Sequence, residues 1–273
     1  MQYQYLELLK NTLLDIHRAD TGELKRIQDN PKSWKLKILS FIDKFLLKFG
    51  YTIVKIVPFC EDNRILGKDW PANAETMIGL KRMENIQYCI EDILKNNIDG
   101  DLIETGVWRG GAAIWMKGLL KAYGDKNKVI WVADSFCGLP KPNSNKYKYD
   151  KGDKHHQYNE LSVSVEVVKK NFEKYGLLDK NVKFLVGWFK DTLPCAPIKK
   201  LCLLRLDGDM YESTIDALNN LYSKLSIGGY VIIDDWGAVN ACKQAVLDFR
   251  EENGILEEII PIDWSGVYWK KLK

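Results

Sequence analysis

Residues 201–235 read LCLLRLDGDMYESTIDALNNLYSKLSIGGYVIIDD, and their pattern decides the fold. An apolar run at 201–207 is followed by a segment of helical period at 211–225 and by a second apolar run at 229–235. Both runs are nearly continuous in Val, Ile and Leu, which is typical of strands buried on both faces of a parallel sheet. The stretch therefore predicts a strand, a helix and a second strand that lies parallel to the first.

The same alternation fills the C-terminal two-thirds of the chain. Further strand-like runs lie at 101–105, 129–134 and 182–186, and further segments of helical period lie at 111–123, 161–175 and 239–253. This repetition predicts an α/β protein with a doubly wound, mostly parallel sheet. Two last strand-like runs, 256–261 and 267–272, are joined by a linker short enough for an antiparallel hairpin. A Rossmann-like sheet that ends in a C-terminal antiparallel hairpin is the plan of the class I methyltransferases.

The first 100 residues have a different pattern. Segments of helical period lie at 6–16, 33–49 and 77–96. We expect an N-terminal helical cap on the sheet rather than a domain with a core of its own. The lysine-rich segment 38–59 is expected to pack in this cap or to form a subunit interface, and a position on a membrane surface is the alternative.

Composition argues against several classes of protein. The 273 residues include 40 Lys and Arg and 37 Asp and Glu, a net charge of +3, so charge gives no reason to expect a nucleic-acid partner. The six cysteines form no CxxC pair, which argues against a zinc site or a small disulfide framework. The first residues lack the features of a signal peptide, and charged residues interrupt the most apolar stretch, 38–59. We expect a cytoplasmic protein with no membrane span.

Ligands of open α/β sheets bind at the carboxyl ends of the strands. The first such end is the stretch 104–111, ETGVWRGG, in which glycines permit close backbone approach and the following helix offers free N–H groups. Its spacing differs from the G-x-G-x-x-G of dinucleotide-binding turns, and a simple tight turn is the alternative. Asp134 closes the next strand, where a carboxylate can accept hydrogen bonds from ribose hydroxyls. For Asp134 the alternative is a turn or helix-cap carboxylate.

Three further carboxylates follow two strands that are expected to be neighbours. Asp207 closes one of them, and Asp234 and Asp235 close the other. Carboxylates that converge in this way repel one another unless a cation binds them, and an oxygen-only ligand set suits Mg²⁺. No basic partner for the three is visible in the sequence, and solvated loop carboxylates are the alternative. Asp209 we assign to the N-cap of the helix that follows it.

These motifs resemble the macrocin O-methyltransferase family. The resemblance rests on residues 104–111, 131–140, 187–194, 204–213, 229–244 and 262–269, and it begins near 75–79. It implies an enzyme that depends on S-adenosylmethionine and Mg²⁺ and methylates a sugar hydroxyl of a glycoside, a nucleotide sugar or another natural product. The partner is then a small sugar-containing acceptor. Residues 1–100 become the cap and oligomerisation region of a homo-oligomer, and residues 101–273 become the cofactor-binding methyltransferase domain.

The resemblance also implies roles for individual residues. The implied cofactor contacts are Thr76, Met77, Glu104, Thr105, Gly106, Val107, Trp108, Asp134, Ser135, Gly187 and Trp188. The implied metal ligands are Asp207, Asp234 and Asp235, and Asp207 is also placed to accept the proton of the substrate hydroxyl.

Other readings of the sequence stay open. An NAD(P)-dependent oxidoreductase on a Rossmann sheet is one, although the missing G-x-G-x-x-G and the terminal hairpin argue against it. A non-catalytic scaffold that binds the cofactor is another. His155 and His156, in a polar segment expected to form a mobile loop, either contact the substrate or lie in solvent. Trp264 and Trp269 either line a sugar site or pack in the core.

Overall fold

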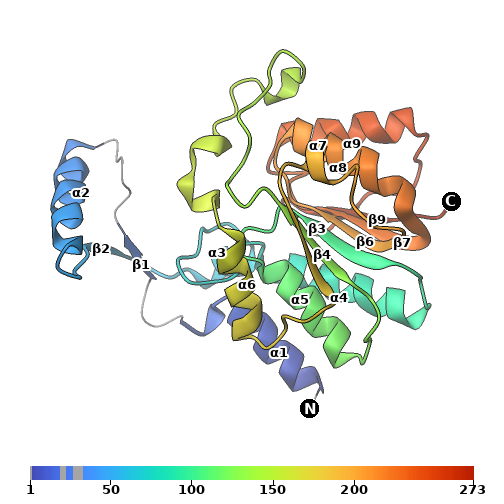
Figure 1. The fold of residues 1–273 in the computed structure, drawn as a ribbon, viewed down its shortest axis with the longest axis horizontal. Helices are drawn as coiled ribbons and strands as arrows, with labels where there is room; N and C mark the ends of the chain where they lie inside the picture. Colours follow the sequence, from blue (N-terminus) through green and yellow to red (C-terminus); the bar gives the residue numbers. More distant parts are fainter. Residues whose placement is uncertain (1, 19–22, 27–32) are drawn as a thin grey trace.

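A computed structural model of the chain describes residues 2–18, 23–26 and 33–273. Its main sheet has seven strands in the order β5-β4-β3-β6-β7-β9-β8 (Figure 1). The strands are β3 (Asp101–Thr105), β4 (Ile130–Asp134), β5 (Val182–Val186), β6 (Leu201–Leu206), β7 (Leu225–Ile233), β8 (Ile260–Pro261) and β9 (Val267–Lys270). The first five in spatial order are parallel, β9 is antiparallel to β7, and β8 is antiparallel to β9. The predicted Rossmann-like sheet with a C-terminal hairpin is confirmed.

Helices cover both faces of this sheet. One hydrophobic cluster contains residues of α1 (Gln2–Leu13), α4 (Gly79–Lys95), α5 (Gly111–Ala122) and α6 (Val165–Lys174). The other contains residues of α8 (Tyr211–Leu221) and α9 (Asn240–Glu252), which follow the short α7 (Phe189–Thr192). Leu102 belongs to the first cluster and its neighbour Ile103 to the second, because successive side chains of a strand point to opposite faces. The continuous apolar runs of the sequence are explained by this double burial.

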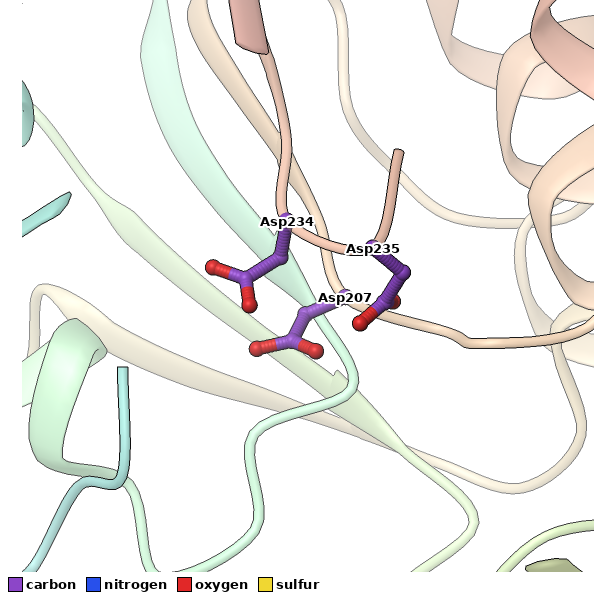
Figure 2. A group of neighbouring side chains, drawn as sticks. All are labelled: Asp207, Asp234 and Asp235. Atoms are coloured by element: carbon purple, nitrogen blue, oxygen red, sulfur yellow. The ribbon is translucent and has the colours of Figure 1, made fainter. Parts of the chain in front are cut away.

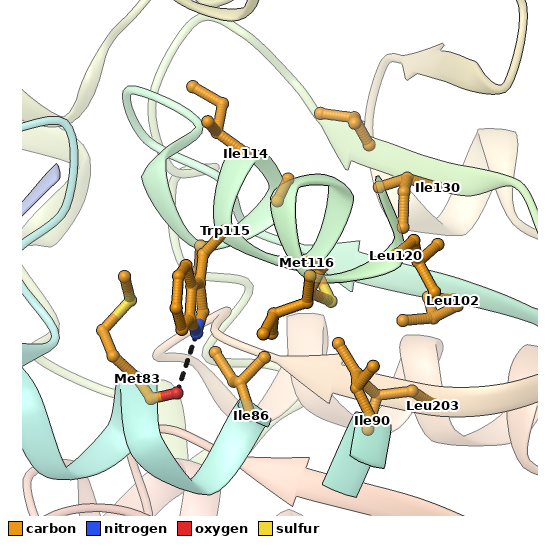
Figure 3. Close-up of a cluster of buried hydrophobic side chains, with 14 of the residues drawn as sticks. Met83, Ile86, Ile90, Leu102, Ile114, Trp115, Met116, Leu120, Ile130 and Leu203 are labelled. Atoms are coloured by element: carbon orange, nitrogen blue, oxygen red, sulfur yellow. Dashed lines mark hydrogen bonds between the residues drawn. The ribbon is translucent and has the colours of Figure 1, made fainter. Parts of the chain in front are cut away.

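Trp115 on α5 anchors the N-terminal region to the sheet layer. Its Nε1 donates a hydrogen bond to the backbone oxygen of Met83 on α4, at 2.9 Å, inside the cluster shown in Figure 3. Met83, Ile86 and Ile90 lie on one face of α4 because they are spaced by three and four residues. Where α5 begins, Gly111 donates its N–H to the backbone oxygen of Glu75 at 2.9 Å, and a Cβ at Gly111 would lie 2.5 Å from that oxygen. The segment before α4 is thereby held at the carboxyl edge of the sheet.

The rest of the N-terminal region forms a projection that we call the arm, residues 23–57 as far as the structure describes them. In it, a two-stranded antiparallel sheet of β1 (Glu23–Arg26) and β2 (Val54–Val57) carries α2 (Trp34–Leu47), and Figure 1 shows α2 extended to one side of the body. The helix at 33–49 was expected, but the β1–β2 pairing was not. The expected packing of this segment in the cap is wrong, because large apolar side chains of α2 are exposed.

The remaining elements are short. They are α3 (Glu61–Ile65), which leads from the arm back to the body, and 3₁₀ helices at Ile16–Arg18, Lys148–Asp150, His155–Gln157, Asn159–Leu161 and Tyr222–Lys224. In the part of the chain that the structure describes, no helix combines the length and the apolar character needed to cross a bilayer.

Candidate functional site

A cavity of about 650 Å³ opens at the carboxyl edge of the parallel strands. The candidate residues from the sequence line it, with two exceptions, Thr105 and Gly187. Thr105 is buried in β3, and Gly187 donates its N–H to the backbone oxygen of Asp134 at 2.9 Å, which joins the ends of β4 and β5. The structure therefore gathers motifs from distant parts of the chain around one cavity.

The glycine-rich turn after β3 lies against the end of β6. Gly106 has a φ of +83°, and a Cβ there would lie 1.7 Å from the backbone oxygen of Asp207, so no other residue fits. Asp134 orders the same turn, because its Oδ2 accepts from the Val107 N–H at 2.8 Å and its Oδ1 from the Phe136 N–H at 2.7 Å. Burial raises the pKa of Asp134. Asp134 is thus a turn carboxylate, which was the alternative from the sequence. This role leaves lone pairs of its carboxylate available to a ligand.

The three predicted aspartates meet beside this turn. Asp207 follows β6, while Asp234 and Asp235 follow β7, and the last residues of these strands, Leu206 and Ile233, are register partners. One ligand oxygen from each aspartate lies within 4.8 Å of the others (Figure 2). The predicted convergence of the trio is confirmed.

The trio carries an excess of buried negative charge. Burial raises the pKa of Asp207 to about 7, and the Asp234 carboxylate adds to the shift. Burial raises the pKa of Asp235 well above its usual range, with Asp209 and Asp207 adding to it. Without a cation, each of these carboxyl groups therefore holds its proton to a higher pH than usual. A bound cation would compensate the same negative charge.

Two arginines contact the trio, so the expectation of no basic partner is wrong. Nη1 of Arg205 donates to Asp207 Oδ2 at 2.9 Å, and its Nη2 pairs with Asp234. Arg82, from α4, pairs with the other oxygen of Asp234. Arg205 precedes Asp207 by two residues, so both lie on the same side of the strand. The period of two of a strand could therefore have predicted this contact. Arg82 is 152 residues from Asp234, and no local pattern connects them.

The donor set fits a divalent cation. Around the cavity, the five carboxyl groups of Glu104, Asp207, Asp209, Asp234 and Asp235 face the guanidinium groups of Arg82 and Arg205. Among the described residues no ion pair involves Asp235, and the trio offers only oxygen atoms. Such a set suits Mg²⁺ better than a softer metal.

Asp209 has a different role from the one expected. The helix α8 has Met210 as its N-cap, and Asp150 accepts from the N–H groups of Tyr211 and Glu212 at 2.7 and 3.0 Å. The N-cap assignment of Asp209 is therefore wrong, because a carboxylate 61 residues away takes that place. Asp209 instead lines the cavity with a φ of +57°, and burial raises its pKa to about 6.

Aromatic side chains also line the cavity. Trp70, Tyr149 and Trp264 are among its lining residues, and Trp70 was not singled out in the sequence. Trp269 is buried in the core, so of its two alternatives core packing is the correct one. His155 also lines the cavity, with its Nδ1 2.6 Å from Asp153 Oδ2.

Comparison with known proteins agrees with this geometry. The chain matches the family described as Macrocin-O-methyltransferase (TylF) over residues 2–271. It belongs to this family. It is 54% identical to the demethyldecarbamoylnovobiocin O-methyltransferase of Streptomyces niveus over 214 residues. The aligned residues cover 78% of this chain and 82% of the relative. It is 53% identical over 210 residues to the 8-demethyl-8-(2,3-dimethoxy-alpha-L-rhamnosyl)-tetracenomycin-C 4'-O-methyltransferase of Streptomyces olivaceus, which is 77% of this chain and 80% of that one.

Solved structures place this macrocin O-methyltransferase family member in the same fold class. The O-methyltransferase NovP aligns over the whole of both chains with a TM-score of 0.86 and 44% identity. The calicheamicin methyltransferase CalS11 aligns over 92% of this chain and 98% of its own, with a TM-score of 0.57 and 16% identity, which shows a shared fold. The protein is therefore an O-methyltransferase with the class I methyltransferase sheet.

Proposed function

We propose that this O-methyltransferase uses S-adenosylmethionine and Mg²⁺ to methylate a sugar hydroxyl of a glycoside, a nucleotide sugar or another natural product. The observation that carries the proposal is that one cavity contains the glycine turn with Asp134 and, beside it, the trio of Asp207, Asp234 and Asp235. The printed name of the Streptomyces olivaceus relative includes a rhamnosyl group, which supports a sugar acceptor.

The cofactor end of the cavity is assigned to the turn and its neighbours. Residues 104–108, Ser135, Trp188 and the Thr76–Met77 pair would surround S-adenosylmethionine, with Gly187 shaping the turn before Trp188. Asp134 would accept from ribose hydroxyls through Oδ2, since a carboxylate oxygen has two lone pairs and the Val107 N–H uses one of them. Its Oδ1 accepts from the Phe136 N–H and from Ser135 Oγ at 3.4 Å. Thr105 supports this end from within β3.

The catalytic end is assigned to the trio. Asp207, Asp234 and Asp235 would hold Mg²⁺, which when bound lowers the pKa of a hydroxyl beside it. Asp207 would accept the proton of the acceptor, since it lies in the trio beside the place where the hydroxyl would be held. Arg205 holds Asp207 and Asp234 in place from the buried side, and the aromatic rim of Trp70 and Trp264 would orient a sugar ring.

A methyl-transfer screen tests the proposal. The full chain is incubated with S-adenosylmethionine, with Mg²⁺ or excess chelator, and with nucleotide sugars and glycosides, and the products are read by mass. We expect a gain of one methyl group on a sugar, only with the metal. Binding of NAD in place of S-adenosylmethionine would favour the oxidoreductase, and cofactor binding without transfer to any acceptor would favour the scaffold.

A homo-oligomeric state and a domain boundary near residue 100 stay predictions. Light scattering tests the first and limited proteolysis tests the second.

A further inference from the structure

The arm carries an apolar stripe that no described part of the chain covers. Trp34, Ile38, Phe41 and Phe45 are spaced by four, three and four residues, so they lie on one face of α2. Phe49 extends this stripe beyond the helix, since its ring centroid lies 5.3 Å from that of Phe45. The exposed fractions of Trp34, Phe41 and Phe45 are 67%, 77% and 56%.

The opposite face of α2 is fixed to the segment that leads into β2 of the two-stranded sheet. Asp43 is buried there, and its Oδ1 accepts from Thr52 Oγ1 at 2.7 Å and from the Ile53 N–H at 2.6 Å. The helix is therefore tied to β2 on one side and presents the stripe on the other. The exposed state of the stripe follows from this attachment.

The exposed aromatic residues of the arm together reach the upper end of the range for surface patches. An aromatic side chain offers about 150–250 Å², so Trp34, Phe41, Phe45, Phe49 and Tyr51 at their exposures present roughly 600 Å². The largest apolar patch of a typical monomer is about 300–600 Å² and is often functional. Other large apolar residues of the arm are exposed as well: Leu24, Leu36, Leu39, Ile42, Leu47, Val54 and Ile56. A surface of this size needs a macromolecular or lipid partner.

Charge decides which partner fits. Residues 23–57 contain eight Lys and Arg and three Asp and Glu, a net charge of +5, so the rest of the chain carries −2. At 100° per residue, Lys35 lies at one edge of the stripe and Lys37 at the other, and Lys48 follows the end of α2 on the same side as Lys37. An aromatic face bordered by lysines is typical of helices that lie in the interface of an anionic membrane. A second copy of the arm would bring the same positive charge to the same edges.

We propose that the arm docks this enzyme on an anionic lipid surface, with the stripe of α2 among the acyl chains and the flanking lysines at the headgroups. The arm returns to the body near the cavity: Val57 ends β2, and Gly67, ten residues later, already lines the cavity. Ten residues span at most about 35 Å. The cavity therefore lies within that chain length of the end of the arm. The inference concerns the arm alone and does not depend on the proposed function.

Vesicle flotation of the full chain tests the proposal. We expect the protein to float with vesicles of phosphatidylcholine and phosphatidylglycerol, to float far less with phosphatidylcholine alone, and to detach as salt is raised. Phe41→Ser with Phe45→Ser, and separately Lys37→Gln with Lys48→Gln, should each weaken binding about tenfold or more. Ile227→Ser with Leu256→Ser, at exposed apolar positions of the body, is the matched control and should float like the wild type.

Three results would overturn the proposal. They are an absence of flotation with either vesicle, equal flotation with both, and a lysine variant that binds as tightly as the wild type. A wild-type dimer that the double Phe variant converts to a monomer in light scattering would also overturn it, because a second copy would then cover the stripe. Equal thermal unfolding midpoints for all variants confirm that each remains folded.

Discussion

Glu104 and Arg205 are register partners on β3 and β6, and Glu104 Oε1 lies 2.5 Å from Arg205 Nη1 in the interior of the protein. Arg205 also contacts Asp207 at the end of its own strand and Asp234 at the end of β7. One buried guanidinium thus connects the ends of three strands. The removal of one member of such a network leaves the others buried without compensation, which costs more than the contacts themselves contribute.

Arg205→Gln should therefore destabilise the fold. We expect the free energy of unfolding to fall by about 3–5 kcal/mol, because Asp207 and Asp234 lose their shared partner. Denaturant unfolding measures the change. Lys200→Gln is the control, since the Lys200–Asp99 pair lies in solvent and its loss should leave the unfolding midpoint nearly unchanged. Equal effects of the two changes would show that the buried network does not stabilise the fold.

The sheet was predictable because each parallel strand is buried on both faces and therefore appears as an apolar run. The predicted strand at 182–186 agrees with β5 at both ends, and the one at 101–105 agrees with β3. The trio followed from the same rule, since neighbouring parallel strands end at the same edge. Features that depend on contacts between distant segments were missed. Arg82 reaches Asp234 from α4, and Asp150 reaches the start of α8 from a loop.

The arm shows a second limit of the sequence. The helical period of the apolar residues predicted α2, but it did not reveal what the apolar face of the helix contacts. An apolar face on a helix predicts that this face is buried. In the structure α2 instead extends away from the body, because it lies between β1 and β2, which pair with each other although 27 residues separate them. β1 (ELKR) contains a single apolar residue and gives little local signal, although its partner β2 (VKIV) is mostly apolar.

The stability of the metal-free protein should depend on pH through Glu104. Burial raises its pKa to about 8 from 4.5, despite the nearby Arg205. The folded state then keeps a proton that the unfolded chain releases, so the free energy of unfolding falls as the pH rises between 4.5 and about 8. Glu104→Gln cannot titrate and should reduce this fall. Denaturant unfolding in chelator across that range measures both proteins, and parallel curves would contradict the prediction.

Asp235→Asn is the sharpest test of the metal site. Asp234 is less suitable, because it pairs with both Arg82 and Arg205 and its change would also disturb the fold. Asn at 235 keeps an oxygen that accepts from the Asp209 N–H. Calorimetry should show binding of Mg²⁺ or Mn²⁺ weakened about tenfold or more, and chelator should abolish methyl transfer. Asp216→Asn, which lines the same cavity outside the trio, is the control. Full activity of demonstrably metal-free protein would refute the metal assignment.

Asp134→Asn should weaken cofactor binding. We expect about tenfold lower affinity for S-adenosylmethionine and its demethylated product, about 1.5 kcal/mol for hydrogen bonds to a charged group, and no binding of NAD. Asp125→Asn is the matched control, because Asp125 also accepts from two backbone N–H groups but lies outside the residues that line the cavity. Calorimetry measures both variants. Unchanged affinity in Asp134→Asn would remove this residue from the cofactor site.

The last prediction concerns the loop at 141–160, which contains the polar segment with His155 and His156 that the sequence predicts to be mobile. Hydrogen bonds fix it at two points, and between them the centroid of the Tyr158 ring lies 5.8 Å from that of Trp70. Asp150 accepts from the first N–H groups of α8, and the backbone oxygen of Glu160 accepts from Trp108 Nε1 at 2.8 Å. His155, which lines the cavity, lies between these points. Motion that admits an acceptor should therefore be confined to the stretch between them, while the amides of Tyr211 and Glu212 stay protected.

Hydrogen exchange with and without cofactor product and acceptor measures this directly. We expect exchange at 151–159 to slow when both ligands bind, and exchange at the start of α8 to stay slow throughout. Asp150→Ala should cost about 1 kcal/mol of stability, as the loss of a helix cap does, and should raise exchange along the loop and at Tyr211. Deletion of 143–151 is a poorer experiment, because it removes Asp150 together with the loop. If the amides at 151–159 are as protected in the free protein as in the complex, the loop is a fixed wall of the cavity and the prediction of a mobile loop is wrong.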